Sequence, residues 1–217
     1  MSTHQPNPLP APRIADSADV DVSATIGDGT LVWHLAQIRE DVRIGAECIL
    51  GRGAYLGPGV LVGDRCKIQN HALVYEPAVL GDGVFIGPAV VFTNDLLPRA
   101  ITPDGALKNA ADWHAVGVTV RDGASIGARA VCIAPVTIGR WAMVAAGAVV
   151  TGDVADHALV VGVPARRIGW VGRAGARLVA EGADASDRAD GADAASWRCP
   201  ETGERYREVD GLLERVH

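Results

Sequence analysis

The chain has 217 residues, of which 48% are hydrophobic and 21% charged, and its formal net charge is −6. This length indicates one domain with tails, and an acidic balance without any basic run argues against a nucleic-acid-binding surface. No apolar stretch is long enough to span a membrane, and the first residues lack the segments of a signal peptide. We therefore expect a cytoplasmic protein that binds neither nucleic acid nor membrane.

Residues 1–13 are polar and rich in proline, and we expect them to form a flexible N-terminus. After them, an aliphatic or aromatic residue recurs at every sixth position, and a small or β-branched residue usually follows it four positions later. The members of the first run are Val20, Ile26, Val32, Ile38, Ile44, Leu50, Leu56, Val62, Ile68, Val74, Leu80, Ile86 and Phe92. The series resumes at Val120 and continues to Val150. This pattern is a hexapeptide repeat.

A period of six matches neither a helix nor a simple alternating strand. It matches a chain that turns a corner every six residues, so that three faces close a triangular coil of about 18 residues. Successive coils then stack as short parallel strands about 4.8 Å apart. The sequence predicts an all-β protein, a parallel β-helix of about six triangular coils over residues 14–172.

Residues 94–119 break the period, and an insertion of this length inside a compact domain usually has a function. We expect a long loop that leaves one corner of the prism. Residues 173–217 are expected to form a linker and C-terminal tail, with a short helix at 173–181. The four cysteines match no zinc spacing, and we expect no metal. Cys48 and Cys66 lie one coil apart, and we expect them to be buried free thiols and not a disulfide.

Residues 18 apart should lie above one another on one edge of the prism. One such column contains His34, Arg52 and Asn70, and His71 lies beside the last of them. The next corner carries Glu76 and Asn94, which Tyr75 flanks. These side chains are suited to an extended anionic substrate, with Arg52 and His34 placed to bind a phosphate and Asn70 placed at the reacting end. The alternative is that outward positions are polar simply because they face water.

Three segments resemble the hexapeptide-repeat acyltransferases with a left-handed β-helix: VWHLAQIRED, KIQNHALVYEPAVLGDGVFIGPAVVFTNDLLPRA and IGRWAMVAAGAVVTGDVADHALVVGVPARRIGWV. Within that family they are most similar to bacterial nucleotide-sugar N-acetyltransferases. These enzymes acetylate the 3-amino group of a UDP-2-acetamido-3-amino-2,3-dideoxyglucuronate or of dTDP-3-amino-3,6-dideoxyhexoses. The resemblance implies left-handed winding, acetyl-CoA as co-substrate, and a homotrimer with active sites between subunits.

The resemblance also implies where the acyl donor and the sugar would bind. Ala145 and Ala146 would offer backbone groups to the pantetheine arm, and Arg166 and Arg167 would meet CoA phosphates. The insertion would reach over the sugar nucleotide, where Arg99 is a candidate partner for a sugar carboxylate, with Lys108 as an alternative.

Many members of the superfamily carry a histidine general base where this chain has Asn70. An amide cannot accept the proton, but its carbonyl oxygen can hold the amine. We therefore expect Asn70 to orient the amine and His71 either to contribute modestly as a base or to bind substrate. For the branch that this chain resembles, the CoA sulfur has been suggested as the proton acceptor. The nucleotide, the sugar and the acyl chain stay open.

Three other functions are alternatives. The first is transfer to a hydroxyl, which Asn70 disfavours because an alcohol needs deprotonation more than a neutral amine does. The second is a zinc lyase of the γ-carbonic anhydrase kind, for which His34, His71 and His114 do not have the required spacing. The third is a non-catalytic β-helix that serves oligomerisation or sugar-nucleotide binding.

Overall fold

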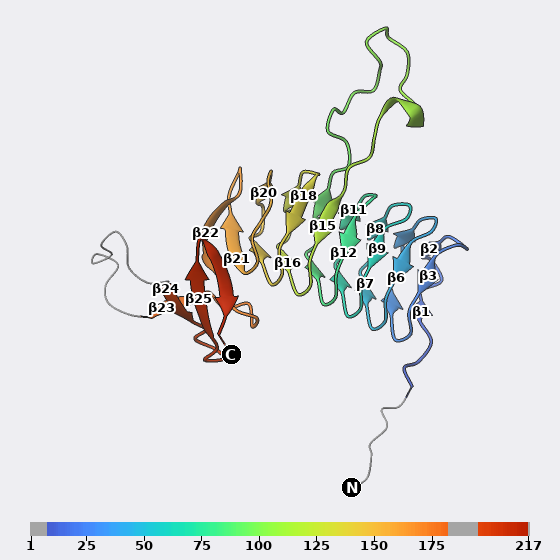
Figure 1. Cartoon of the computed structure of the whole chain (residues 1–217). Helices are drawn as coiled ribbons and strands as arrows, with labels where there is room; N and C mark the ends of the chain where they lie inside the picture. Colours follow the sequence, from blue (N-terminus) through green and yellow to red (C-terminus); the bar gives the residue numbers. More distant parts are fainter. Residues whose placement is uncertain (1–7, 182–194, 217) are drawn as a thin grey trace.

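The computed structural model describes residues 8–181 and 195–216. Most of the expected N-terminal segment and of the expected linker lies outside these residues. The described chain winds as a three-sided solenoid of short parallel strands, from which one long loop rises and against which a small antiparallel sheet packs (Figure 1). No helix of the described chain is long and apolar enough to cross a membrane.

Each face of the solenoid is one parallel sheet, whose strands stack in chain order. The first face contains β1 (Arg13–Ile14), β4 (Leu31–Val32), β7 (Ile49–Leu50), β10 (Lys67–Ile68), β13 (Phe85–Ile86), β16 (Ser125–Ile126), β19 (Met143–Val144) and β21 (Ala158–Val161). The second contains β2 (Asp19–Val20), β5 (Gln37–Ile38), β8 (Tyr55–Leu56), β11 (Leu73–Val74), β14 (Val91–Phe92), β17 (Val131–Cys132) and β20 (Val149–Val150). The third contains β3 (Thr25–Ile26), β6 (Arg43–Ile44), β9 (Leu61–Val62), β12 (Val79–Leu80), β15 (Val118–Val120) and β18 (Val136–Ile138).

The register of these sheets confirms the predicted coil. Lys67 pairs with Ile49 on one side and with Phe85 on the other, so one coil takes 18 residues. The six-residue period arises because a two-residue strand alternates with a four-residue corner. The predicted parallel β-helix is confirmed. Its first face stacks eight parallel strands, which is more than the six that the expected number of coils would give. The extra layers come from β1 and β21, which lie beyond the first and last repeats that we counted.

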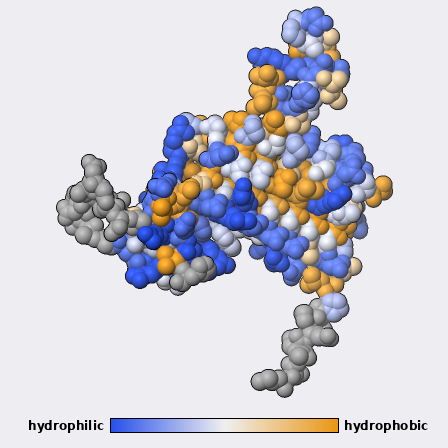
Figure 2. Space-filling model, viewed as in Figure 1, coloured by the Kyte–Doolittle hydropathy of each residue, from blue (hydrophilic) through white to orange (hydrophobic). Residues whose placement is uncertain are grey.

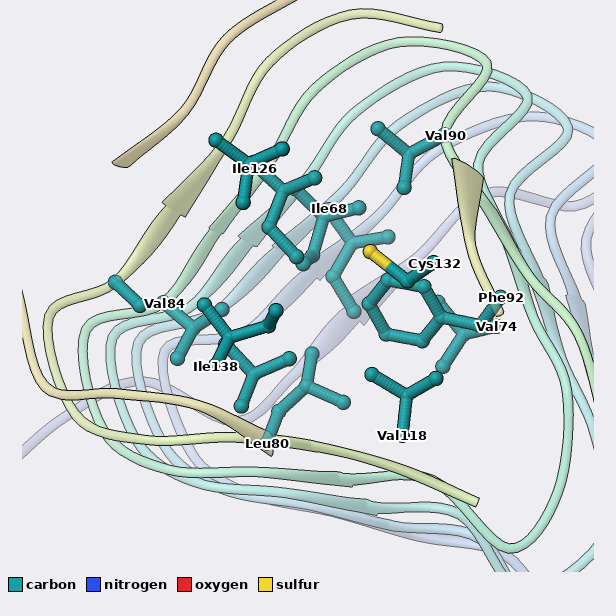
Figure 3. Packing of buried hydrophobic residues seen from close by; sticks show 14 of the residues in the cluster. Ile68, Val74, Leu80, Val84, Val90, Phe92, Val118, Ile126, Cys132 and Ile138 are labelled. Carbon is teal, nitrogen blue, oxygen red and sulfur yellow. The ribbon is translucent and has the colours of Figure 1, made fainter. Parts of the chain in front are cut away.

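The second residue of most strands points into the prism and forms its core. Ile68, Val74 and Leu80 come from the three successive faces of one coil and meet in the interior (Figure 3). Burying one such side chain stabilises the fold by about 1.5–3 kcal/mol. Cys48 and Cys66 occupy the small column at a corner, where they are buried free thiols, as expected.

The insertion leaves the solenoid after β14 and returns at β15, and it projects well away from the prism (Figure 1). It contains an antiparallel bridge between Ile101 and Leu107 and a 3₁₀ turn at Ala110–Asp112. Its apolar side chains are exposed, with Leu107 at 79%, and they colour the projecting loop in part orange in Figure 2. The predicted long loop at one corner is thus confirmed, and we call it the arm.

The chain after the solenoid does not form the short helix expected at 173–181. It turns at Gly175, whose φ is +79°, and bridges Val171 to Arg177 before β23 (Val179–Glu181) begins. Strand β23 pairs with β24 (Ala195–Arg198), and β25 (Arg205–Val209) and β26 (Leu212–Arg215) complete a four-stranded antiparallel sheet. Strand pairing overrides the weak helix propensity of this segment.

The side chain of Glu208 links the C-terminal sheet to β22 (Arg166–Trp170) through hydrogen bonds. Strand β22 pairs antiparallel with β21. Glu208 Oε2 accepts hydrogen bonds from Trp170 Nε1 at 3.0 Å and from Trp197 Nε1 at 3.1 Å. Glu208 Oε1 accepts from Arg167 Nη1 at 3.2 Å. Burial opposes ionisation of Glu208, but the hydrogen bonds from Trp170, Arg167 and Trp197 together outweigh it and lower the pKa of the carboxyl.

We expect Glu208→Ala to lower the free energy of unfolding by about 2 kcal/mol, because hydrogen bonds to a charged group contribute more than neutral ones. The contribution of a carboxyl with a lowered folded pKa is present above its ordinary pKa and is lost as pH falls through the folded value. In urea unfolding, wild type and variant should therefore differ fully at neutral pH, and the difference should shrink as pH falls below the ordinary glutamate pKa of about 4.3. Glu214→Ala on β26 is the matched control; a Glu208 variant as stable as this control at neutral pH would contradict the assignment.

Candidate functional site

The polar column predicted from the 18-residue spacing exists on the edge between the first and second faces. His34, Arg52 and Asn70 each lie two residues past the inward residue of β4, β7 and β10, which pair in register. His34 Nδ1 lies 2.9 Å from Ser17 Oγ, so its Nε2 is free among the described residues. The Arg52 guanidinium is exposed and has no partner there either. The edge therefore presents one ring nitrogen of His34 and the guanidinium of Arg52 to solvent.

Asn70 has a structural bond that the sequence pattern did not lead us to expect. Its Oδ1 accepts a hydrogen bond from the backbone N of Arg52 at 2.9 Å, one coil below. Asp64 makes the same bond to the backbone N of Ala46 at 2.8 Å on another edge. Oδ1 thus accepts one structural bond, and Nδ2 has no partner in the described chain. The side chain can therefore donate a hydrogen bond outward through Nδ2, while the carbonyl contact expected from sequence would use the second lone pair of Oδ1.

His71 has a φ of +59° and its ring lies against the backbone of Gly53, one coil below. A Cβ at Gly53 would lie 2.6 Å from His71 Nδ1, so glycine is the residue that permits this position. His71 is exposed and adjacent to Asn70 in sequence. The structure thus brings the two candidate catalytic residues onto one rung of the edge.

Gly53→Ala tests this contact, with Gly59→Ala as the matched control. Both glycines have positive φ, +63° and +69°, but a Cβ at Gly59 meets nothing within 4 Å. We expect the control to cost about 1 kcal/mol of unfolding free energy through backbone strain alone. Gly53→Ala should cost more and should also lower activity, because the His71 ring must move. Equal melting temperatures and equal activities for the two variants would contradict the contact.

The second predicted group lies on the next edge. Asn94 Nδ2 donates to Glu76 Oε1 at 3.2 Å, and this bond ties the root of the arm to the coil below. Glu76 Oε2 is buried and lacks a hydrogen-bond partner in the described chain. The reason is that the residue one coil below is Pro58, which has no N–H to donate. The ring of Tyr75 lies 5.1 Å from that of Tyr55, and it is 36% exposed.

The pKa of the Tyr55 phenol depends on burial and on the nearby Glu76. Burial and, second, the negative charge of Glu76 raise the pKa of Tyr55. A phenol on β8 therefore lies near the carboxyl group of Glu76 on the adjoining edge. This combination offers both a hydrogen-bond donor and an acceptor to a polyhydroxylated ligand.

The structure does not bring the predicted arm residue to these edges within one chain. Arg99 is exposed, and its Nη1 donates to the backbone oxygen of Pro98 at 3.0 Å. Lys108 Nζ donates to the backbone oxygen of Leu97 at 3.4 Å. Both residues belong to the arm, which extends away from the solenoid (Figure 1).

The predicted donor-binding residues divide into two groups. Ala145 and Ala146 follow β19 at the same edge as Asn70. Ala146 is exposed, whereas the backbone N of Ala145 donates to Val160 O and its backbone O accepts from Ala148 N. Arg166 is exposed, and its Nη1 donates to the backbone oxygen of Ala165 at 2.9 Å. Arg167 instead bonds Glu208 and lies over the Trp170 ring, 4.2 Å from its centroid. Arg167 is therefore engaged by the C-terminal sheet, which could not be expected from sequence because the contact spans 41 residues.

Two stretches of the solenoid match known families of hexapeptide repeats. A model of the bacterial transferase hexapeptide (six repeats) matches residues 23–58, and one of the hexapeptide repeat of succinyl-transferase matches residues 117–152. Both parts of the solenoid, before and after the arm, are therefore similar to the hexapeptide repeats of bacterial transferases. The relatives that match are named for different acetyl acceptors, a dTDP-linked 3-amino sugar in one case and serine in another.

Among curated proteins, the chain is similar to a dTDP-3-amino-3,6-dideoxy-alpha-D-galactopyranose 3-N-acetyltransferase of Aneurinibacillus thermoaerophilus. The two are 39% identical over 97 residues, which cover 45% of this chain and 44% of that protein. The serine acetyltransferase of Escherichia coli K12 is 36% identical over 80 residues, which cover 36% of this chain and 28% of that protein. The chain thus spans less than half the length of both relatives.

Among solved structures, the acetyltransferase domain of PglB from Neisseria gonorrhoeae matches with a TM-score of 0.50 and 20% identity. The match covers 72% of this chain and 57% of that one. At this identity the likeness concerns the fold alone. It agrees with the solenoid described above.

Proposed function

We propose that this protein is an acetyl-CoA-dependent N-acetyltransferase that acts on the amino group, in particular the 3-amino group, of a UDP- or dTDP-linked sugar. The observation that carries the proposal is the edge on which His34, Arg52, Asn70 and His71 stack on successive coils. The relative from Aneurinibacillus thermoaerophilus, which is named for N-acetylation of a dTDP-linked 3-amino sugar, supports the same assignment.

The edge has the order of groups that such a substrate requires. His34 and Arg52 offer cationic or hydrogen-bonding nitrogens to a diphosphate, and Asn70 and His71 stand one coil further on, where the sugar would lie. Tyr75, Glu76 and Asn94 on the neighbouring edge would bind sugar hydroxyls.

The acyl donor would extend along the same edge toward the last coils. The exposed backbone at Ala146 would meet an amide-bearing pantetheine arm, whereas the backbone groups of Ala145 already bond Val160 and Ala148, so Ala145 would contribute mainly a small side chain that leaves room for the arm. Arg166 is exposed and fits a CoA phosphate. Arg167 would contribute there only by releasing Glu208.

In the reaction, the lone pair of the neutral amine attacks the thioester carbonyl and forms a C–N bond. Asn70 Nδ2 would donate to the oxygen that gains negative charge, a role for which fixed hydrogen-bond donors are effective. The C–S bond then breaks, the sulfur leaves as a thiolate, and the proton of the new ammonium passes to that sulfur. His71 would orient the sugar or assist this transfer.

The homotrimer belongs to the proposal as well. The arm that carries Arg99 projects away from its own solenoid, so it would reach an edge site only on a neighbouring copy (Figure 1). A site shared between subunits would place Arg99 beside a sugar carboxylate. We propose that the active sites lie in the clefts between three such copies.

A thiol-release screen tests the function. Acetyl-CoA is mixed with the protein and with UDP- or dTDP-linked 3-amino and 4-amino sugars, and the free CoA thiol is measured against a reaction without acceptor. We expect release with at least one 3-amino sugar nucleotide. Serine and the corresponding 3-hydroxy sugars serve as hydroxyl acceptors, because one relative is a serine acetyltransferase. Thiol release with a hydroxyl acceptor only would replace N-transfer by O-transfer, and no release with any acceptor would favour a binding module.

A further inference from the structure

A cavity of about 450 Å³ lies beside the first two coils, at the N-terminal end of the polar edge. Arg13, Asp16, Trp33 and His34 are among the residues that line it. It combines an aromatic ring with a cation and a carboxylate, and it adjoins the histidine that begins the predicted phosphate column. None of the roles proposed above uses Trp33.

Trp33 is an unusual residue for its place in the repeat. The equivalent corner positions, 18 residues apart, are small or polar, namely Ala15, Gly51, Gln69 and Gly87. The solenoid therefore needs no large ring at this corner. Trp33 nevertheless retains 43% of its surface exposed, and the Arg13 guanidinium lies over the ring at 5.7 Å from its centroid. An indole held in place beside a cavity is a stacking surface for a planar ligand.

The spacing along the edge fits a nucleoside diphosphate sugar. His34 follows Trp33 directly, Arg52 lies one coil further, and Asn70 lies one coil beyond that. Two coils span about 10 Å. A base beside Trp33 would thus place a diphosphate along His34 and Arg52 and a sugar at Asn70, in the order in which these groups are linked.

We infer that the cavity beside Trp33 holds the base of the sugar nucleotide. The inference rests on the proposed function and deepens it by assigning the nucleotide end of the substrate. The base stacks on Trp33, and the Asp16 carboxylate accepts a hydrogen bond from a base N–H or a ribose hydroxyl. The Arg13 guanidinium, which lies 5.7 Å from the centroid of the Trp33 ring and also lines the cavity, donates to a carbonyl oxygen of the base. His34, which Ser17 holds through Nδ1, directs Nε2 to the phosphate.

Calorimetric titration of the full chain with UDP, dTDP and GDP tests the inference without any acyl donor. At least one of these should bind, and Trp33→Ala should weaken the tightest of them by about tenfold or more, as expected for loss of base–aromatic stacking. Trp33→Phe should restore most of the affinity. Leu35→Ala, at an exposed apolar residue of the same corner outside the cavity lining, should bind as wild type does. Inorganic pyrophosphate should bind more weakly and be insensitive to Trp33→Ala.

Unchanged affinity of Trp33→Ala for the tightest nucleotide would overturn the inference. If the wild type also releases thiol with an amino sugar nucleotide, the proposed function survives and only the base site is wrong. If no nucleotide binds and no acceptor releases thiol, both are wrong. Equal weakening of nucleotide and pyrophosphate binding would likewise reject the base site, because it would assign Trp33 to the phosphate.

Discussion

Replacing Asn70 with aspartate is expected to lower kcat by about 10²-fold while leaving the melting temperature close to that of the wild type. The aspartate keeps an oxygen where Oδ1 accepts from the backbone N of Arg52, as Asp64 does for Ala46. It removes the Nδ2 donor that we assign to the developing oxyanion. Steady-state kinetics with the best acceptor of the thiol-release screen, together with thermal unfolding, measure the two effects separately.

Asn70→Ala is the companion variant, because it removes both the structural bond and the donor. We expect it to lose about 1 kcal/mol of unfolding free energy in addition to the loss in kcat. Asn70→Asp with wild-type kcat would remove Asn70 from the chemical step. A rise in the Michaelis constant with an unchanged kcat would instead assign this side chain to uniform substrate binding.

Phe92→Ala is expected to produce the largest loss of stability in the solenoid, about 3–5 kcal/mol. Phe92 is fully buried, and Figure 3 shows its ring in the interior near Val74 and Cys132. The residue ends β14, directly before the arm leaves the prism. A cavity at this point would therefore also weaken the support of Asn94 at the root of the arm. Urea unfolding gives the change in free energy.

The control for this variant is Phe92→Leu, which retains most of the buried volume and should cost clearly less than Phe92→Ala. Equal costs for the two would indicate that the ring is not packed as described. A loss below about 1 kcal/mol for Phe92→Ala would show that the interior collapses around the missing ring.

The solenoid could be predicted because its stability depends on a local, repeated requirement. Every face needs one inward apolar side chain per coil, such as Ile68 or Val74, so apolar residues recur every six positions in the sequence. The position of the arm followed from the place where that period stops. The left-handed winding stays a prediction from the family resemblance. The C-terminal sheet could not be predicted, because Trp170, Trp197 and Glu208 meet through contacts without a period.

The site was predictable in its stacking but not in its hydrogen bonds. The 18-residue spacing placed Arg52 and Asn70 on one edge, and the structure confirms that placement. The bond from the backbone N of Arg52 to Asn70 Oδ1 was missed. A signal for it existed, since Asp64 and Asp82 occupy the same position after the inward residue on another edge and make equivalent bonds. The roles of all these residues in catalysis and binding stay predictions.

The most direct test of the proposed function is to identify the product formed from acetyl-CoA and a dTDP- or UDP-linked 3-amino sugar. Mass spectrometry and NMR of the purified sugar nucleotide reveal whether one acetyl group has been added and which atom carries it. We predict an amide at the sugar nitrogen, formed in step with free CoA thiol. An ester at a sugar hydroxyl, or an unmodified sugar nucleotide after prolonged incubation, would contradict this prediction.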